Sequence, residues 1–199
     1  ERVQLPDTSQ QPKESFGTQV KNIIKGLTTN RALVGIIVAA IFLLLAQLLV
    51  GTMNAYLYAD YFQNYRALAI AGVAGAAGVL VLAPFSNKIA SRFGKKESGT
   101  VALLWSATIY TLLFFMGTSN VWLFLVLASL GNLGMNYFNI IIWAFITDII
   151  DYQEIRTGKR EDGTVYAVYS FARKLGQALA GGLGGFALSA IGYVSAAST

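Results

Sequence analysis

The 199-residue chain contains no cysteine and no histidine, and only 13% of its residues are charged. Without these two residue types it can form no disulfide, thiol nucleophile, Ser-His-Asp triad or structural zinc site of its own. About 25% of the residues of a soluble domain are charged, and half that fraction cannot cover a globular surface. Since 55% of the residues are hydrophobic, the composition indicates a membrane protein. The net charge of +5 then bears on topology rather than on nucleic-acid binding.

Long apolar runs predict an all-α, polytopic membrane helix bundle with five spanning helices. A helix crosses a hydrocarbon core of about 30 Å with about 20 residues, so the charge-free run 98–147 is too long for one span. The turn-forming residues 117–120 divide it in two. Buried helices of a large soluble protein are the alternative, but they do not explain five such runs in succession. The predicted spans are about 32–59, 67–87, 98–117, 121–147 and 164–194.

The basic residues predict which loops face the cytoplasm. Five spans make the loops alternate between the two sides, and the charges alternate with them, as the positive-inside rule requires. One side carries only Arg66. The N-terminal segment and the loops 88–97 and 151–162 are therefore predicted to be cytoplasmic, in a multi-pass protein of the plasma membrane. Their basic residues are Arg2, Lys13, Lys21, Lys25, Arg31, Lys88, Arg92, Lys95, Lys96, Arg156, Lys159 and Arg160.

The polar segment 1–31 precedes the first span. It begins with Glu1 and contains no apolar core of a signal peptide, so we expect the sequence to be part of a longer chain. Pro6 and Pro12 disfavour a packed fold at its start, and its last residues suit either a short interfacial helix or a disordered linker. The chain thus divides into a cytoplasmic loop segment, 1–31, and a partial transmembrane bundle, 32–199.

The fifth predicted span contains two adjacent cations, Arg173 and Lys174, about 15 Å from its cytoplasmic end. Two central cations cost on the order of 5–7 kcal/mol on insertion scales, and the large apolar side chains of this span return about 3–6 kcal/mol. We therefore expect the charges to face protein or a water-filled cavity that binds substrate or cation. A snorkelling pair or a structural ion pair is the alternative. One face of the helix, flanked by Tyr169 and Arg173, carries Tyr166, Ser170, Lys174 and Gln177.

The fourth predicted span has a second polar stripe. Its members follow helical spacing, and amides that face lipid would lack partners, so we expect the stripe to face inward. Amide groups suit ligands rich in hydroxyl groups, and the Trp143 ring can lie against the C–H face of a sugar. Hydrogen bonding between helices is an equally good explanation of the asparagines. The stripe consists of Asn132, Asn136, Asn139, Trp143 and Thr147.

Three carboxylates, Asp148, Asp151 and Glu154, follow at spacings of three on one side of a helix end, and Arg160 and Asp162 come after them. Nearby cations favour an ion-pair network that closes the cytoplasmic side as a gate. The alternative is a solvated loop without a gating role, in which each ion pair contributes roughly 0–1 kcal/mol. A different class of protein, a membrane-embedded enzyme or channel subunit that uses this cluster, is also open, with carboxylate-bound Mg²⁺ as its conceivable metal.

Glycines and alanines repeat every four positions in the fifth predicted span, with Gly176, Ala180 and Gly184 in one row and Gly181 and Gly185 in another. Small residues let membrane helices approach closely. We expect these rows to pack helices together rather than to bind a ligand.

The loop 89–96 resembles the short cytoplasmic loop signature of the major facilitator superfamily through Arg92, Gly94, Lys95 and Lys96. Ser91 stands where that signature usually has Asp. The resemblance implies that the chain contains part of the second half of such a transporter.

A longer pattern resembles the glycoside–pentoside–hexuronide:cation symporter family. It begins as Trp143-x4-Asp148-x2-Asp151-Tyr152-x-Glu154-x2-Thr157-Gly158-x-Arg160-x-Asp162-Gly163. It continues as Ser170-Phe171-x2-Lys174-x-Gly176-Gln177-Ala178. Asp162 occupies a position where the family often has Glu. The resemblance covers nearly the whole chain, which would supply the seventh to eleventh of twelve spans.

This resemblance implies symport of a sugar or glycoside coupled to Na⁺ or H⁺, by alternating access between two six-helix bundles. Lys174 would face the central cavity, and Asp148, Asp151, Glu154 and Arg160 would form the gate network. The expected partners are the lipid bilayer, the sugar and an N-terminal six-helix bundle of the same chain, with no nucleic acid. No cofactor or resident metal is expected beyond the coupling cation, whose site would lie in the first half.

Overall fold

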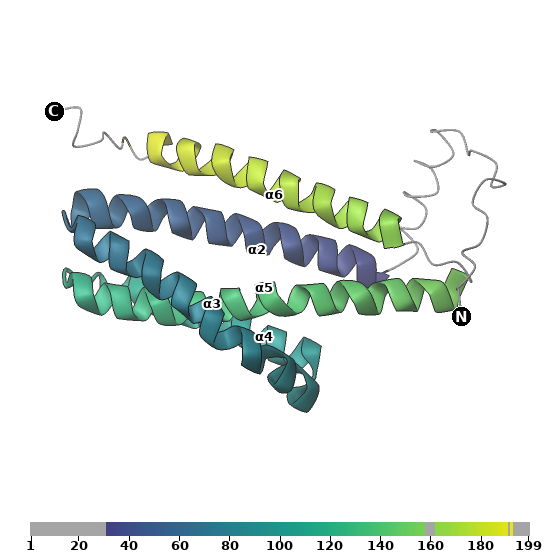
Figure 1. The fold of residues 1–199 in the computed structure, drawn as a ribbon. Helices are drawn as coiled ribbons and strands as arrows, with labels where there is room; N and C mark the ends of the chain where they lie inside the picture. Colours follow the sequence, from purple (N-terminus) through teal and green to yellow (C-terminus); the bar gives the residue numbers. More distant parts are fainter. Residues whose placement is uncertain (1–30, 158–161, 191, 193–199) are drawn as a thin grey trace, which may run out of the picture.

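The computed structural model describes residues 31–157, 162–190 and 192. Predictions for residues 1–30, for Lys159 and Arg160, and for the end of the chain from residue 193 lie outside this part. The described residues form helices without a strand (Figure 1). In chain order these are α2 (Arg31–Tyr56), the π-helical turn η2 (Leu57–Tyr61), α3 (Tyr65–Phe93), α4 (Lys95–Met116), α5 (Val121–Thr157) and α6 (Asp162–Ala190). The predicted all-α helix bundle is confirmed.

Two helices extend beyond the apolar runs that predicted them. Instead of ending near residue 87, α3 continues to Phe93, and α5 continues to Thr157 instead of ending near residue 147. The cause is the same in both: the apolar run measures the hydrocarbon core, whereas the helix continues through polar residues that lie at the membrane surface. The motif residues at these two ends are therefore largely helical, not loop residues.

Four helical segments of the described chain are long and apolar enough to cross a membrane: 31–61, 65–93, 95–116 and 121–155. The fifth predicted span, α6, is 29 residues long but is not among them. Its two central cations and its glycine-rich second half lower its hydropathy, which agrees with the near break-even insertion energy estimated above. Whether α6 spans the bilayer therefore depends on what it packs against, and its role as a span stays a prediction.

The helices run back and forth along one axis. Figure 1 shows the start of α2, the α3–α4 turn, the end of α5 and the start of α6 toward one end of the bundle, and η2 and the α4–α5 turn at the other. The cations Lys88, Arg92, Lys95 and Lys96 thus gather toward the end at which α2 begins. This grouping of basic residues at one end is the pattern that the alternating loops predicted, and the side of the membrane that this end faces stays a prediction.

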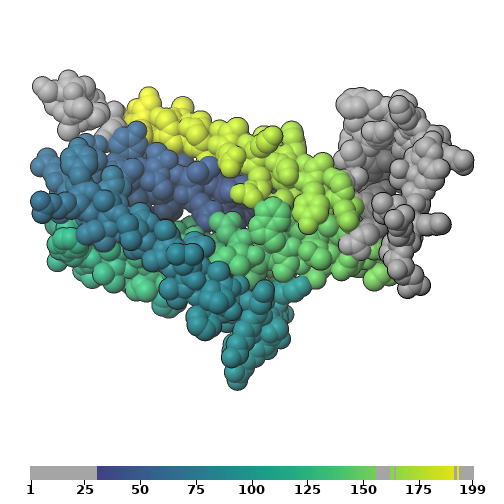
Figure 2. All heavy atoms as spheres, in the orientation of Figure 1, coloured from purple at the N-terminus to yellow at the C-terminus, as the bar shows by residue number. Residues whose placement is uncertain are grey.

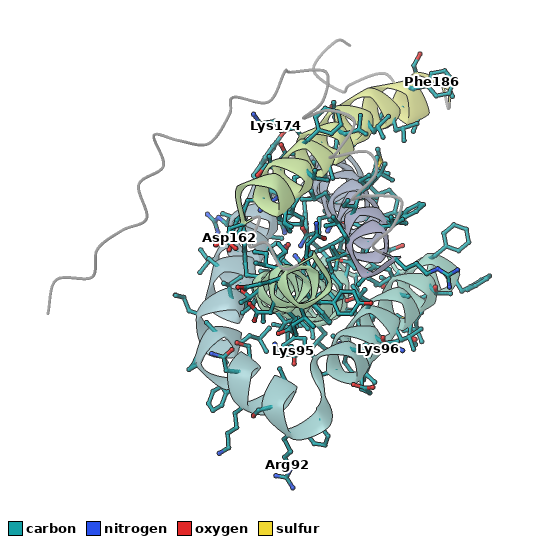
Figure 3. The ribbon with its side chains drawn as sticks, turned by 90° about the vertical axis from the view of Figure 1, so that its right-hand side faces the viewer. Arg92, Lys95, Lys96, Asp162, Lys174 and Phe186 are labelled. Atoms are coloured by element: carbon teal, nitrogen blue, oxygen red, sulfur yellow. The ribbon has the colours of Figure 1, made fainter. Side chains whose placement is uncertain are left out.

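The core forms where α5 meets α2 and α6. Viewed along the bundle, α5 lies in the middle of the other helices (Figure 3). Ile142 and Ile146 of α5 are fully buried, together with Leu33 of α2 and Val165 of α6. Figure 2 shows α6 lying along α2 for most of its length. One long face of α6 is consequently left without a neighbour among the described helices.

Hydrogen bonds and a glycine join α4 to α5. Ser106 donates from Oγ to the carbonyl oxygen of Gly131 at 2.6 Å, and Trp105 donates from Nε1 to that of Leu130 at 2.9 Å. Gly134 faces the backbone carbonyl of Ala102, where a Cβ atom would collide with it. Because lipid provides no hydrophobic force between helices, close packing and such bonds hold membrane helices together.

One glycine row packs α6 against α2, as predicted. A Cβ atom on Gly176 would lie 3.3 Å from the carbonyl oxygen of Ile41, and Ala180 is buried in the same row. The second row is different, since Gly181 and Gly185 have open space beside them. The four-residue spacing is the same in both rows. The sequence therefore predicts close packing for both rows and does not show which of them has a partner helix.

Candidate functional site

An aromatic and cationic cluster forms where α5 meets the first half of α6. The Trp143 ring lies 5.5 Å from the ring of Tyr169, in an edge-to-face arrangement, and 6.4 Å from that of Tyr166. The guanidinium carbon of Arg173 lies 5.9 Å from the Trp143 ring centre and 5.8 Å from that of Tyr169. Such cation–π contacts stabilise a charge that is partly removed from water, by roughly 0.5–2 kcal/mol each. Arg173 is therefore held by aromatic rings.

The polar face of α6 points away from the bundle. Its four predicted members, Tyr166, Ser170, Lys174 and Gln177, are all exposed. Lys174 forms no ion pair within the described part of the chain, and Figure 3 places it at the outer margin of α6. The opposite face of the helix, which includes Ala172 and Gly176, is buried against α2. The two adjacent cations thus have different surroundings. Arg173 packs on the rings of Trp143 and Tyr169, and the Lys174 side chain is exposed.

The asparagine stripe of α5 does not line one cavity. Asn139 donates from Nδ2 to Oε1 of Gln47 on α2 at 2.8 Å. Asn136 turns its amide toward Gly78 of α3 instead, and Trp143 packs against α6. For Asn139 the structure favours interhelical hydrogen bonding. Sequence reasoning missed Gln47, although it is one of two amides, with Asn54, in the otherwise apolar run 32–59, and this was the available signal.

An ion pair links the α3–α4 turn to α5. Nζ of Lys95 lies 2.7 Å from both carboxylate oxygens of Asp148. The side chains are 38% and 53% exposed, so the pair contributes roughly 0–1 kcal/mol in solution. Gly94 allows the turn, because its φ of 90° suits glycine and few other residues. In the sequence the loop motif and the carboxylates are two separate sets of residues. In the structure the Lys95–Asp148 ion pair connects them.

The other residues of these two sets lie near the same end of the bundle. Arg92 places its guanidinium carbon 5.6 Å from the centre of the neighbouring Phe93 ring, and Lys96 is exposed. Asp151 is exposed, and Glu154 and Asp162 are partly buried. Arg160 lies outside the described residues. Within the described ranges no three acidic side chains come together as a metal site would require.

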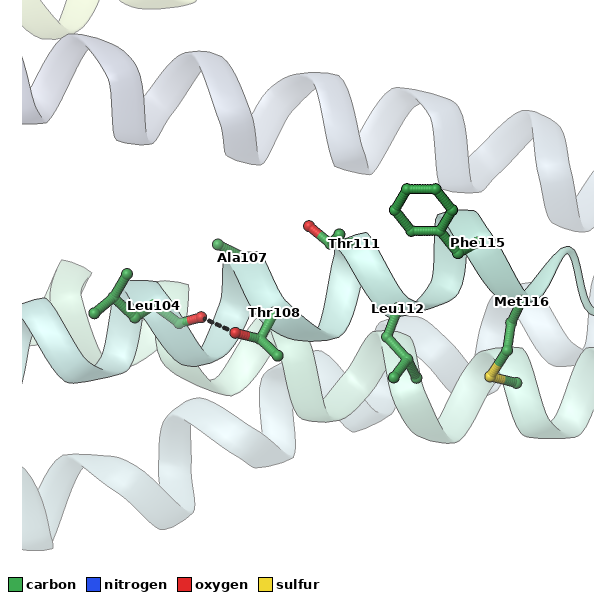
Figure 4. A pocket seen from close by; sticks show the side chains of 7 residues that line it. All are labelled: Leu104, Ala107, Thr108, Thr111, Leu112, Phe115 and Met116. Carbon is green, nitrogen blue, oxygen red and sulfur yellow. Dashed lines mark hydrogen bonds between the residues drawn. The ribbon is translucent and has the colours of Figure 1, made fainter.

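A depression on α4 offers little binding chemistry. All of the residues that line it belong to α4 itself, and Figure 4 shows them along a single helix. Its Thr108 hydroxyl donates to the carbonyl oxygen of Leu104 at 2.8 Å, so that hydroxyl already has an acceptor within the helix. The cluster around Trp143 and the polar face of α6 therefore remain the candidate site.

Comparison with known proteins identifies the family of the chain. The family model described as MFS/sugar transport protein matches residues 1–199, the whole chain. The chain belongs to this family. Members of the MFS/sugar transport family are transporters, so the family membership argues against the enzyme alternative.

Individual relatives support the symporter resemblance. The uncharacterized symporter YjmB of Bacillus subtilis is 33% identical over 94% of the chain and 40% of its own length. The glucuronide carrier protein homolog of Escherichia coli is 28% identical over 86% of the chain and 38% of its own length. A putative glycoside/cation symporter of Escherichia coli, YagG, is 27% identical over 57% of the chain and 25% of its own length. The chain thus resembles the glycoside–pentoside–hexuronide:cation symporters, as the motif predicted.

The chain spans about two fifths of the length of the first two of these relatives. No solved structure matches it. The family and the apolar helices together identify part of a multi-pass membrane transporter.

Proposed function

We propose that the whole protein is a secondary transporter that carries a sugar or glycoside together with Na⁺ or H⁺, and that this chain forms most of its second half. The observation that carries the proposal is the polar face of α6 beside the cluster of Trp143, Tyr169 and Arg173. An exposed Lys174 in the middle of a membrane helix requires water or a polar protein surface. A second bundle of the same protein, facing α6, would enclose a wet cavity there.

The orientation follows from the charges. The end of the bundle with Lys88, Arg92, Lys95 and Lys96 would lie in the cytoplasm, and the end with Arg66 outside. In that orientation the Trp143 cluster lies inside the membrane, and the Lys95–Asp148 pair lies at the cytoplasmic surface. The protein would reside in the plasma membrane.

The sugar would be bound by an aromatic ring and by hydrogen-bonding groups. The Trp143 ring, 47% exposed, offers an apolar plane for the C–H face of a sugar ring, and the hydroxyl and amide groups of Tyr166, Ser170 and Gln177 offer hydrogen bonds. Lys174 would add a cation near the substrate. The coupling cation would bind elsewhere, in the first half of the protein.

Counterflow uptake tests this proposal. The full-length protein, reconstituted into vesicles, is assayed against a small panel of glucuronides, glycosides and pentosides, first with a Na⁺ gradient and then with an H⁺ gradient. We expect saturable accumulation of at least one sugar that depends on one of the two gradients. A flux that neither saturates nor responds to either gradient would indicate a channel and would contradict symport.

The Lys95–Asp148 pair provides a second test, on gating. We propose that Lys95 holds Asp148 in position for the cytoplasmic gate. Lys95→Gln should lower the uptake rate by no more than about fivefold, because an exposed pair contributes roughly 0–1 kcal/mol. Lys95→Glu should lower it further, since it places two carboxylates side by side, and the double reversal Lys95→Glu/Asp148→Lys should recover most of the lost rate.

Lys96→Gln is the matched control, since Lys96 is the exposed neighbour of Lys95 on the same turn. It should transport at the wild-type rate. If the double reversal is as slow as Lys95→Glu alone, the ion pair itself does not position Asp148, and the gating role assigned to Lys95 is wrong.

A further inference from the structure

A second hollow, on the side of α5 away from α6, has a different chemistry from the transport site. It is a groove of about 550 Å³ between α3 and α4, with α5 as its floor. Phe93 of α3, Val101 and Trp105 of α4 and Leu133 of α5 are among the apolar side chains that line it. The Ser98 hydroxyl in its wall already donates to the carbonyl oxygen of Gly94 at 2.6 Å. Apart from the Glu97 carboxylate and the Tyr137 hydroxyl, the groove therefore presents mainly hydrocarbon.

The end of this groove at the α3–α4 turn is positively charged. Arg92 packs its guanidinium on the ring of Phe93, which lines the groove. Lys88 and Lys96 are exposed on the two helix ends, and Glu97 is the one acidic residue in the lining. Figure 3 shows Arg92 and Lys96 at the margin of the bundle. The Lys95–Asp148 pair is neutral overall, and the rest of the turn 88–97 carries three cations, Lys88, Arg92 and Lys96, against one acid, Glu97.

The depth of these cations corresponds to the lipid headgroups. The 29 residues of α3 extend about 43 Å, which equals the thickness of a bilayer including its headgroup regions. With α3 spanning the bilayer, Arg92, one residue from the end of α3, would lie at headgroup level, and the apolar groove would extend from there into the hydrocarbon region.

We propose that this groove is a binding site for an anionic phospholipid. One acyl chain lies in the groove against Val101, Trp105 and Leu133, and the phosphate pairs with Arg92 and Lys96. A sugar suits the groove poorly, because most of its hydroxyl groups would face hydrocarbon. A zwitterionic lipid fits the hydrocarbon part equally well but has no net charge to match the cationic end. This proposal requires only that α3 and α4 span the membrane, and it holds or fails independently of transport.

Trp105 makes the site measurable. The full-length protein is reconstituted into bilayers of unlabelled phosphatidylcholine that contain increasing fractions of phosphatidylglycerol or phosphatidylcholine with brominated acyl chains, which quench tryptophan on contact. The Trp105 signal is the difference between the wild-type protein and Trp105→Phe. Each cation near the surface contributes about 1 kcal/mol of attraction to an anionic lipid. We therefore compare the lipid fraction at which quenching of Trp105 reaches half of its maximum. This fraction should be lower for brominated phosphatidylglycerol than for brominated phosphatidylcholine, by about fivefold or more.

Two controls define the site. Arg92→Gln should reduce the preference of Trp105 for the anionic lipid by about fivefold. Trp122, exposed at the start of α5 and therefore at the opposite end of the bundle, should be quenched equally by both lipids, as measured with Trp122→Phe. Equal quenching of Trp105 by both lipids overturns the anionic site. No quenching of Trp105 by either lipid also overturns it, because the groove is then covered by protein.

A second measurement does not require the Trp105 variant to fold. Native mass spectrometry counts the phosphatidylglycerol molecules that stay bound when each protein is released from detergent. The wild-type protein should retain at least one lipid more than Val101→Trp, whose larger side chain fills the groove. Val101 is 65% exposed, so the larger side chain displaces lipid rather than the protein core. Equal lipid counts in the two proteins overturn the proposal.

Discussion

Replacing Gly134 with valine is expected to abolish folding of the full-length protein in the membrane. Any Cβ atom at this position would overlap the carbonyl oxygen of Ala102 and the Ser106 hydroxyl on α4. Backbone atoms cannot rotate away as a side chain can, so α4 and α5 must separate. Separation stretches the hydrogen bonds that Ser106 and Trp105 donate to α5. Overpacking alone costs about 1–3 kcal/mol, and the lost hydrogen bonds add roughly 1 kcal/mol each.

The yield of monodisperse protein in detergent and its unfolding temperature measure this effect. Gly134→Ala should lower the unfolding temperature, and Gly134→Val should leave no monodisperse protein. Gly35→Val is the control, because Gly35 lies in α2 with no atom within 4 Å of the Cβ position. If Gly134→Val unfolds at the same temperature as the wild-type protein, the close approach of α4 and α5 is wrong.

The helices could be predicted from the sequence because each one follows from a local property. An apolar run of about 20 residues forms a helix in lipid, since a helix satisfies its backbone groups within the segment itself. The turn at 117–120 follows from its residue types, and the structure gives Gly117 a φ of 50°. The helix ends could not be predicted from hydropathy, because Lys88 to Phe93 and Asp148 to Thr157 are helical without being apolar.

The candidate site depends on contacts between helices, which the sequence constrains less. The spacing of Tyr166, Ser170, Lys174 and Gln177 defines one face of α6, and that face indeed lies together in space. The spacing does not show where a face points. Arg173 differs from Lys174 by about 100° around the helix, which places one on the rings of Trp143 and Tyr169 and leaves the other exposed. The pairing of Asn139 with Gln47, 92 positions apart, depends on the same packing.

The transport proposal makes its strongest prediction at Lys174. Lys174→Gln in the full-length protein should abolish sugar accumulation, with a loss of about 100-fold or more, while the protein still inserts into the membrane. An ammonium group in the middle of a membrane helix is costly unless it faces a polar cavity. We therefore expect that the Lys174 ammonium group interacts with the substrate or cation that this cavity binds. Counterflow uptake measures the loss, and Leu183→Ala, at an exposed apolar position of α6, is the control expected to transport normally. Wild-type accumulation by Lys174→Gln would remove Lys174 from the site.

Chemical labelling separates a wet cavity from lipid at the same position. The described chain has no cysteine, so Lys174→Cys introduces one thiol into this half of the protein. A charged, membrane-impermeant maleimide should label this thiol, and a saturating sugar should slow the labelling, because the reagent and the sugar would share one cavity. Leu179→Cys, five residues further along α6 and also exposed in this chain, reports how far the water extends. If Lys174→Cys reacts only with an apolar maleimide that partitions into the bilayer, Lys174 faces acyl chains. The second bundle would then pack elsewhere, and α6 would not line the path of the sugar.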